Sequence, residues 1–221
     1  MIDLYSGTPG SGKSLHMASD IMDILKMGGL VIANFAISPD FLSSKRCKGK
    51  AVYIPDEDMS FPDDIVLLIE YWVEHHPGKK ILLCLDECQN LFNARTWNVR
   101  GRSQWISFFS MHRHISNEKC NVILATQDDK TIDKQIRGRL ERDFKHYKLE
   151  NGGDAFFFVS FLTGRKLFKY RVFWYDQRKH IFSHVYVARK SVFKIYDTHA
   201  AFGDSDNGKK NYKKAASMLG E

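Results

Sequence analysis

Residues 7–14 read Gly7-Thr8-Pro9-Gly10-Ser11-Gly12-Lys13-Ser14, a glycine-rich stretch that ends in a lysine and a hydroxyl residue. All four defined positions of the pattern G-x-x-x-x-G-K-[ST] match. Glycines let backbone N–H groups turn inward around phosphate oxygens, the lysine reaches the β- and γ-phosphates, and the hydroxyl holds Mg²⁺. We therefore predict that the phosphates of a nucleoside triphosphate are bound by Gly7, Thr8, Pro9, Gly10, Ser11, Gly12, Lys13, Ser14 and Leu15.

The segments on both sides of this loop support the prediction. Residues 2–6 read as a short buried strand, and residues 13–26 carry apolar side chains at helical spacing until Gly28 and Gly29 end the pattern. A helix that starts at the loop points its positive dipole end at the phosphates. A glycine-rich turn without a ligand is the weaker interpretation, because it explains neither the strand nor the helix.

Strand and helix patterns alternate up to about residue 142. We predict further strands at 30–33, 51–54, 80–85 and 121–125, helices at 65–74, 103–115 and 131–140, and a loop at 38–50. From residue 143 to 187 the aromatic and β-branched residues predict antiparallel hairpins. The fold class is therefore α/β, a P-loop NTPase with a mainly parallel central sheet flanked by helices and a β-rich C-terminal extension. We divide the chain into a core (1–142), an extension of the same domain (143–202) and a basic tail or linker (203–221).

Polar side chains follow two of the predicted strands. Asp86 and Glu87 come directly after the apolar run 81–85, and Gln127 follows the run 121–126. Ligands bind outside the carboxyl ends of the strands in open α/β sheets. We predict that Ser14 and Asp86 hold Mg²⁺, that Glu87 is the general base for an attacking water, and that Gln127 contacts this water or the γ-phosphate.

A cation on the transferred phosphoryl group often completes such a site, and a neighbouring subunit can supply it. Six arginines are candidates, and we favour Arg137 and Arg139 because they follow the Gln127 strand. The six are Arg95, Arg100, Arg102, Arg113, Arg137 and Arg139. For any single one of them, surface solvation is the competing interpretation.

The composition is that of a globular protein, with 43% hydrophobic and 27% charged residues. No apolar run reaches the roughly 20 residues of a membrane span, and the N-terminus does not resemble a signal peptide. Four scattered cysteines fit a reducing compartment, so we predict a cytoplasmic chain. Residues 1–129 carry 13 Lys and Arg against 16 Asp and Glu, which leaves 20 against 10 for residues 130–221. This basic C-terminal part fits either a solvated surface or an anionic partner.

Several segments beyond the phosphate loop resemble the zonular occludens toxin family, which includes the gene I assembly ATPase of filamentous bacteriophages. The specific segment runs from Leu85 through Asp86-Glu87-Cys88-Gln89-Asn90-Leu91-Phe92-Asn93-Ala94-Arg95-Thr96-Trp97-Asn98. Residues 127–137 and 196–202 are also similar to the family. Together with the phosphate loop, these segments span nearly the whole chain.

The resemblance implies a cytoplasmic ATPase domain, with ATP and Mg²⁺ as ligands, that drives assembly and export of phage particles through the inner membrane. It implies a homo-oligomer that works with the phage coat protein, single-stranded DNA and other phage assembly proteins. Members of the family continue into a transmembrane helix, so the expected location is the cytoplasmic face of the inner membrane. The membrane contact would then be made by a segment absent from this chain.

Three other functions stay open. A double-stranded DNA translocase shares the same core architecture. A small-molecule kinase shares the phosphate loop, although a kinase has no need of a water-activating Glu87. A nucleotide-gated interaction module would bind the nucleotide without useful turnover.

Overall fold

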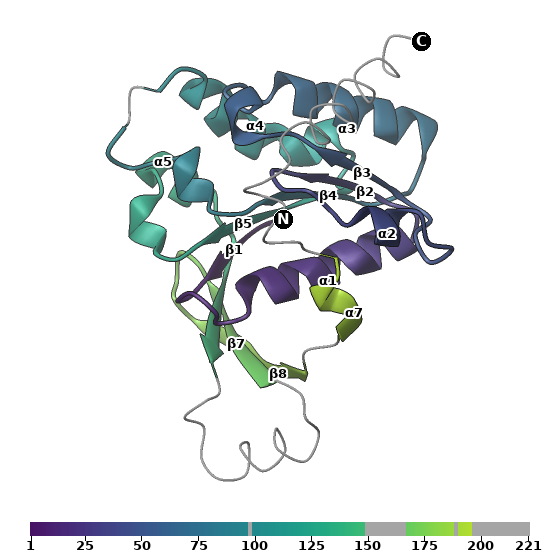
Figure 1. Cartoon of the computed structure of the whole chain (residues 1–221). Helices are drawn as coiled ribbons and strands as arrows, with labels where there is room; N and C mark the ends of the chain where they lie inside the picture. The colour runs from purple at the N-terminus through teal and green to yellow at the C-terminus, as the bar shows by residue number, and fades with distance from the viewer. Residues whose placement is uncertain (97–98, 149–166, 188–189, 196–221) are drawn as a thin grey trace.

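The computed structural model describes residues 1–96, 99–148, 167–187 and 190–195 of the 221-residue chain (Figure 1). Parts of the predicted extension and the whole predicted tail at 203–221 lie outside the described residues. The segment 196–202, which resembles the family in sequence, also lies outside them.

An eight-stranded sheet runs through the molecule in the order β3-β2-β4-β5-β1-β6-β7-β8. Its first six strands are parallel, and β7 and β8 are antiparallel to their neighbours. The mainly parallel sheet with an antiparallel extension confirms the predicted fold class. The strands are β1 (Ile2–Ser6), β2 (Leu30–Ala33), β3 (Lys50–Tyr53), β4 (Ile81–Leu85), β5 (Cys120–Thr126), β6 (Arg142–Lys148), β7 (Leu167–Trp174) and β8 (His180–Val187).

The central strands are buried because both faces of the sheet are covered. Every residue of β1, β2 and β4 is buried, as the continuous apolar runs of parallel strands require. Helix α1 covers one face, and helices α3 and α4 cover the other (Figure 1). The helices are α1 (Lys13–Lys26), α2 (Pro39–Leu42), α3 (Asp63–His75), α4 (Arg102–Ile115), α5 (Lys134–Arg137) and α7 (Lys190–Phe193).

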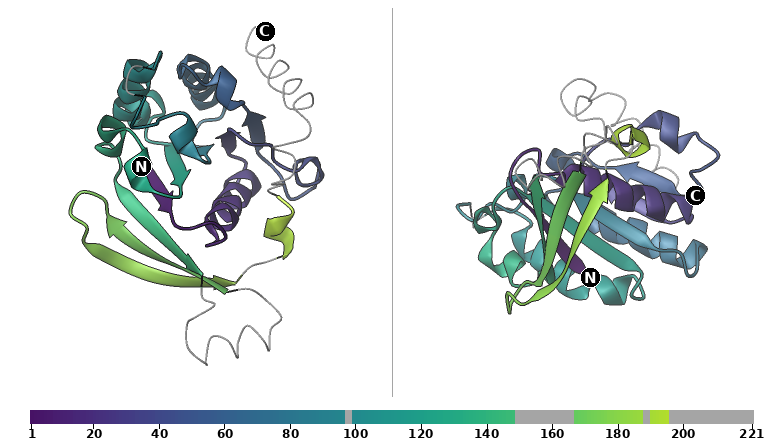
Figure 2. Two further views of the ribbon diagram at one scale, coloured as in Figure 1. Left: turned by 60° about the vertical axis from the view of Figure 1, so that its left-hand side comes forward. Right: turned by 90° about the horizontal axis from the view of Figure 1, so that it is seen from below.

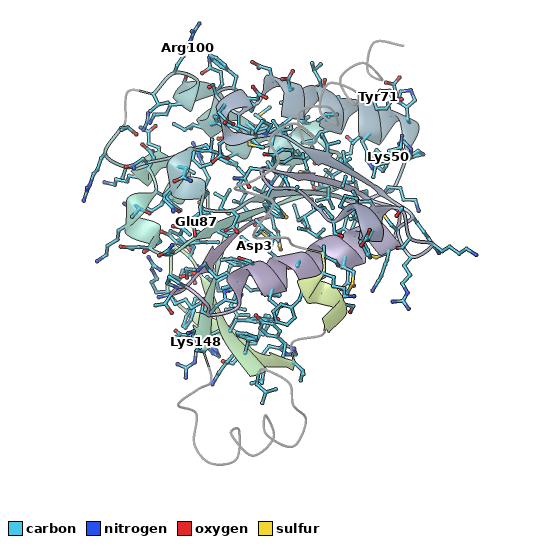
Figure 3. All side chains as sticks on the ribbon, viewed as in Figure 1. Asp3, Lys50, Tyr71, Glu87, Arg100 and Lys148 are labelled. Carbon is cyan, nitrogen blue, oxygen red and sulfur yellow. The ribbon has the colours of Figure 1, made fainter. Side chains whose placement is uncertain are left out.

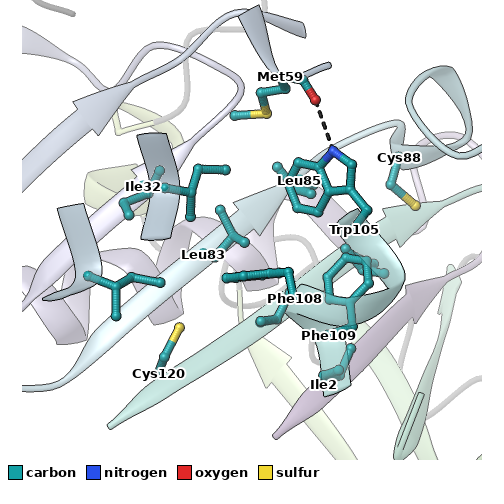
Figure 4. Close-up of a cluster of buried hydrophobic side chains, with 14 of the residues drawn as sticks. Ile2, Ile32, Met59, Leu83, Leu85, Cys88, Trp105, Phe108, Phe109 and Cys120 are labelled. Atoms are coloured by element: carbon teal, nitrogen blue, oxygen red, sulfur yellow. Dashed lines mark hydrogen bonds between the residues drawn. The ribbon is translucent and has the colours of Figure 1, made fainter. Parts of the chain in front are cut away.

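Aromatic side chains of α4 fill the core on the α3 side of the sheet. Trp105, Phe108 and Phe109 pack over β4, beside Leu83 and Leu85 (Figure 4). The Trp105 indole N–H donates to the Met59 carbonyl at 3.0 Å, so its one polar group is satisfied although the ring is buried. This contact ties α4 to the loop before α3.

Two predicted segments differ in the structure. The helix expected at 131–140 is a single turn, α5, preceded by a 3-10 turn at Asp129–Thr131. The Asp133 carboxylate accepts hydrogen bonds from Gln135 N and Ile136 N and so starts the helix three residues later than expected. The loop expected at 38–50 contains the short helix α2, which begins with Pro39 in its first turn.

The extension continues the central sheet. Strand β6 pairs in parallel with β1, from Asp3 opposite Arg142 to Ser6 opposite Lys145. On its other side β6 pairs in antiparallel with β7. The β7–β8 hairpin, residues 167–187, closes this side of the sheet and lies next to α1 (Figure 2). A bulge between Val172 and Phe173 shifts the β7–β8 register.

Candidate nucleotide-binding site

The phosphate loop connects β1 to α1, as predicted from the sequence. Gly10 and Gly12 have φ of 72° and 95°, in the left-handed region that favours glycine. Gly12 is the N-cap of α1, and no side chain caps this helix. The free N–H groups of its first turn therefore remain available to an anion.

Lys13 lies folded over the loop that precedes it. Its Nζ donates to the carbonyls of Gly7 at 2.6 Å and Thr8 at 3.3 Å, and the residue is 7% exposed. Burial lowers the pKa of Lys13, while the nearby carboxylates of Glu87 and Asp86 act in the opposite direction. The ammonium group therefore lies between the loop and the two predicted acidic residues.

Ser14 and Asp86 lie side by side across the gap between α1 and β4. The Ser14 hydroxyl donates to Asp86 Oδ2 at 3.4 Å. The other carboxylate oxygen, Oδ1, accepts a hydrogen bond from the Glu87 backbone N–H at 2.9 Å. Where Mg²⁺ is bound together with nucleotide phosphates, the protein contributes only one or two oxygen ligands. A hydroxyl and a carboxylate at this spacing can supply them. The residues present fit this metal.

Glu87 occupies a strained position at the end of β4 (Figure 3). Its φ of 46° and ψ of 44° are left-handed, which is uncommon for a residue other than glycine. Its carboxylate accepts hydrogen bonds from Gln89 Nε2 at 2.5 Å and Gln127 Nε2 at 3.2 Å. The structure therefore brings together the predicted pair Glu87 and Gln127. Such backbone strain is typical of functional positions.

The structure does not bring the favoured arginines to this site. Arg137 lies close enough to Asp129 and Tyr175 to influence their pKa values, and Arg139 is exposed. Within residues 1–96, 99–148 and 167–187, no contact joins either arginine to Lys13 or Glu87. A role for Arg137 or Arg139 in the same subunit thus lacks support, and a role toward a neighbouring subunit stays a prediction.

Two further arginines of the candidate set are engaged elsewhere. Arg102 forms a two-bond ion pair with Asp133, at 3.0 and 3.1 Å. Arg113 pairs with Glu141. Both guanidinium groups therefore already have carboxylate partners within the chain.

Two residues that the sequence analysis missed hold the acidic pair. The Asn34 side chain accepts from the Asp86 backbone N–H and donates to the Asp86 carbonyl, both at 2.8 Å. Gln89 bridges Glu87 and the hydroxyl of Thr126, to which its Oε1 is 2.8 Å distant. Asn34 follows the buried strand β2, so the rule that found Asp86 and Gln127 could also have found it. Gln89 carries no comparable signal.

The chain is similar to phage proteins of known sequence. It is 29% identical to the Gene 1 protein of Enterobacteria phage fd over 138 residues, which are 61% of this chain and 38% of that protein. The Gene 1 protein of Escherichia phage If1 is also 29% identical, over 147 residues. The chain thus spans less than two fifths of the length of these relatives. Among the described helices, none has both the length and the apolar character that crossing a membrane requires.

Solved structures share the fold. The N-terminal domain of zonular occludens toxin from Neisseria meningitidis superposes with a TM-score of 0.55 at 19% identity, covering 89% of this chain and 98% of that one. The genome packaging NTPase B204 of Sulfolobus turreted icosahedral virus 2, bound to ATP-gammaS, gives a TM-score of 0.52 at 13% identity, covering 85% and 96%. The family model described as Zonular occludens toxin (Zot) matches residues 1–201. The chain therefore belongs to the zonular occludens toxin family.

Proposed function

We propose that the chain is the ATP-hydrolysing motor domain of a machine that assembles filamentous phage and exports it through the inner membrane. One observation carries the catalytic part of this proposal. Lys13, the Ser14–Asp86 pair and Glu87 converge at the carboxyl ends of β1 and β4, and Gln127 reaches the Glu87 carboxylate at 3.2 Å. The phosphate loop alone would explain binding of a nucleotide. The hydrogen-bonded Glu87 carboxylate next to it adds a base that can accept a proton from water.

The residues divide the chemistry as follows. The N–H groups of the loop and of the first turn of α1 bind the phosphates, and Lys13 exchanges its two carbonyl contacts for β- and γ-phosphate oxygens. Ser14 and Asp86 would hold Mg²⁺, which would neutralise charge on these phosphates. Glu87 accepts a proton from water as the water oxygen bonds to the γ-phosphorus and the bond to the β-phosphate oxygen breaks. Gln127 and Gln89 orient the Glu87 carboxylate.

The proposed setting comes from the family and from the phage origin of the Gene 1 relatives. We propose that the chain acts as a homo-oligomer on the cytoplasmic face of the inner membrane. Its partners there would be the complex of coat protein and single-stranded DNA and other phage assembly proteins.

One observation favours a second candidate, a nucleotide-gated interaction module. No arginine of the described residues contacts the phosphate loop or Glu87, so the arginine that often completes hydrolysis is not found among them. ATP binding with negligible turnover at every protein concentration would support this module. The kinase alternative gains no support from the contacts of Glu87, whose carboxylate is bonded by Gln89 and Gln127.

The test is steady-state ATP hydrolysis as a function of protein concentration. We expect the rate to rise more than linearly in the parent and to be lost in Glu87→Gln, while Glu87→Gln still binds ATP. Glu74→Gln is the matched control, because Glu74 is an exposed carboxylate on α3. Hydrolysis that survives Glu87→Gln would refute the assignment of the base. A failure of the parent to bind ATP would refute the proposed function as a whole.

A further inference from the structure

The β7–β8 hairpin contacts the phosphate loop directly. The Tyr186 hydroxyl donates to the Gly12 carbonyl at 2.6 Å, across 174 residues of sequence. A Cβ atom at Gly12 would lie 2.5 Å from Tyr186 Oη and 2.6 Å from Phe168 Cδ1. The hairpin thus packs closely against Gly12. It lies next to α1 (Figures 1 and 2).

The Gly12 carbonyl belongs to the peptide group that also carries the Lys13 N–H. A peptide group is planar and trans, so a bond that holds the carbonyl also fixes the direction of the N–H on its other side. The same carbonyl accepts the first helical bond of α1, from His16 N at 3.0 Å. With both bonds made, the Gly12–Lys13 peptide has one orientation before any ligand arrives.

Tyr186 is itself held in place by three rings, two from β7 and one from α1. It stacks on Phe168 with centroids 5.6 Å apart, and it lies 5.5 Å from the His16 ring and 5.8 Å from the Tyr170 ring. Burial raises the pKa of Tyr186 far above its ordinary value, so the hydroxyl keeps the proton that it donates. The hydrogen bond to Gly12 is therefore made by a protonated hydroxyl whose ring is packed against three others.

The turn of the same hairpin contacts the loop that follows Gln127. Arg178 Nη2 lies 3.2 Å from Asp129 Oδ2, and the Tyr175 hydroxyl donates to the same oxygen at 3.1 Å. Asp129 is two residues beyond Gln127 in the sequence. One hairpin therefore touches both the loop that holds phosphates and the segment that orients Glu87.

We propose that Tyr186 is a positioning residue that sets the Gly12–Lys13 peptide for phosphate binding, and that it couples the nucleotide site to the β7–β8 hairpin. The part of this inference that concerns phosphate rests on the proposed function. Because coupling between two sites is reciprocal, a nucleotide that binds the ordered loop must also stabilise the hairpin. Nucleotide binding at the loop would then also change the stability of the hairpin turn, at the far end of β7 and β8.

The test compares Tyr186→Phe, which removes only the hydroxyl, with Tyr71→Phe, which removes a hydroxyl on the outer surface of α3 (Figure 3). Without nucleotide, backbone amides of residues 7–15 should exchange with solvent about fivefold faster in Tyr186→Phe, the loss of one hydrogen bond. The Kd for ATP should rise by a similar factor. Tyr71→Phe should match the parent in both measurements.

Nucleotide binding gives a third readout. ATP should slow amide exchange in residues 167–187 of the parent and of Tyr71→Phe, and much less so in Tyr186→Phe. Equal exchange of residues 7–15 in the two variants would overturn the inference, even if the parent binds ATP and the proposed function stands. If the parent binds no ATP, the proposed function fails, whereas faster exchange in Tyr186→Phe alone still supports the positioning of the loop.

Discussion

Replacing Asn34 with alanine should loosen the acidic end of β4. The Asn34 side chain makes three hydrogen bonds at 2.8 Å, two with the backbone of Asp86 and one with Asp56 Oδ1. Each such bond contributes about 1 kcal/mol net, so their loss should lower the free energy of unfolding by about 3 kcal/mol. Because Asp86 is also released, Mg²⁺-dependent ATP binding should weaken together with stability.

The assay is urea unfolding at pH 7, followed through the fluorescence of the buried Trp72 and Trp105. Asn121→Ala is the control, because Asn121 makes one exposed bond of 3.2 Å with the N-terminal ammonium. It should cost less than about 0.5 kcal/mol. If Asn34→Ala lost less than about 1 kcal/mol with an unchanged slope against urea, the three bonds would not hold the acidic end as described.

A second substitution separates bonding from charge. Asn34→Asp keeps an acceptor for the Asp86 N–H but places a carboxylate against Asp56, whose pKa is already raised by burial. Like charges raise each other's pKa, so the folded form binds an extra proton and gains stability as the pH falls. Asn34→Asp should therefore be less stable than Asn34→Ala at pH 7, and the gap should narrow at pH 4. A gap that does not change with pH would contradict this reasoning.

Three further outcomes follow from the same structure. In urea unfolding, Glu87→Gly should be more stable than Glu87→Ala by about 1 kcal/mol. Both variants lose the carboxylate, but only alanine still carries the cost of a left-handed backbone. Equal stabilities would show that the turn is unstrained. Arg102→Lys keeps the charge but loses the two parallel hydrogen bonds to Asp133. A loss of about 1 kcal/mol in the free energy of unfolding should lower the Tm measured by calorimetry by about 2–4 °C. An unchanged Tm would contradict this expectation. Burial lowers the pKa of His16 to about 3 and of His146 to about 4, so the unfolded chain binds more protons between these values and 6.5. Stability should therefore rise with pH across that window, by up to about 1.4 kcal/mol per pH unit for each histidine, and level off above it; His146→Gln should flatten the profile, and a parent profile without this slope would refute it.

The parallel part of the sheet could be predicted because its strands are buried on both faces and read as unbroken apolar runs, as in residues 81–85. The loop residues and the acidic pair could be found because each follows such a run. The length of α5 could not, because the Asp133 side chain, rather than the apolar spacing, decides where that helix begins.

Site residues that come together only through contacts between distant segments could not be predicted from the sequence. Tyr186 and Phe168 belong to an aromatic-rich stretch that indicates strands but not their neighbours. They meet Gly12 only because β6 pairs with β1 and brings β7 and β8 alongside. Arg137 likewise lies near Asp129 and Tyr175 and, among the described residues, contacts neither Lys13 nor Glu87, a placement that no local pattern reveals.

The position of β1 in the sheet has a consequence for synthesis. Residues 2–6 leave the ribosome well before their strand partners, which lie at residues 122–126 and 142–145. At a translation rate of about 5–20 residues per second, the first strand waits on the order of ten seconds before a partner exists. During that interval an apolar segment next to an unformed phosphate loop is exposed to chaperones and to other nascent chains. Synonymous codons that slow translation between residues 7 and 120 would lengthen this exposure and lower the yield of folded chain without changing a single contact.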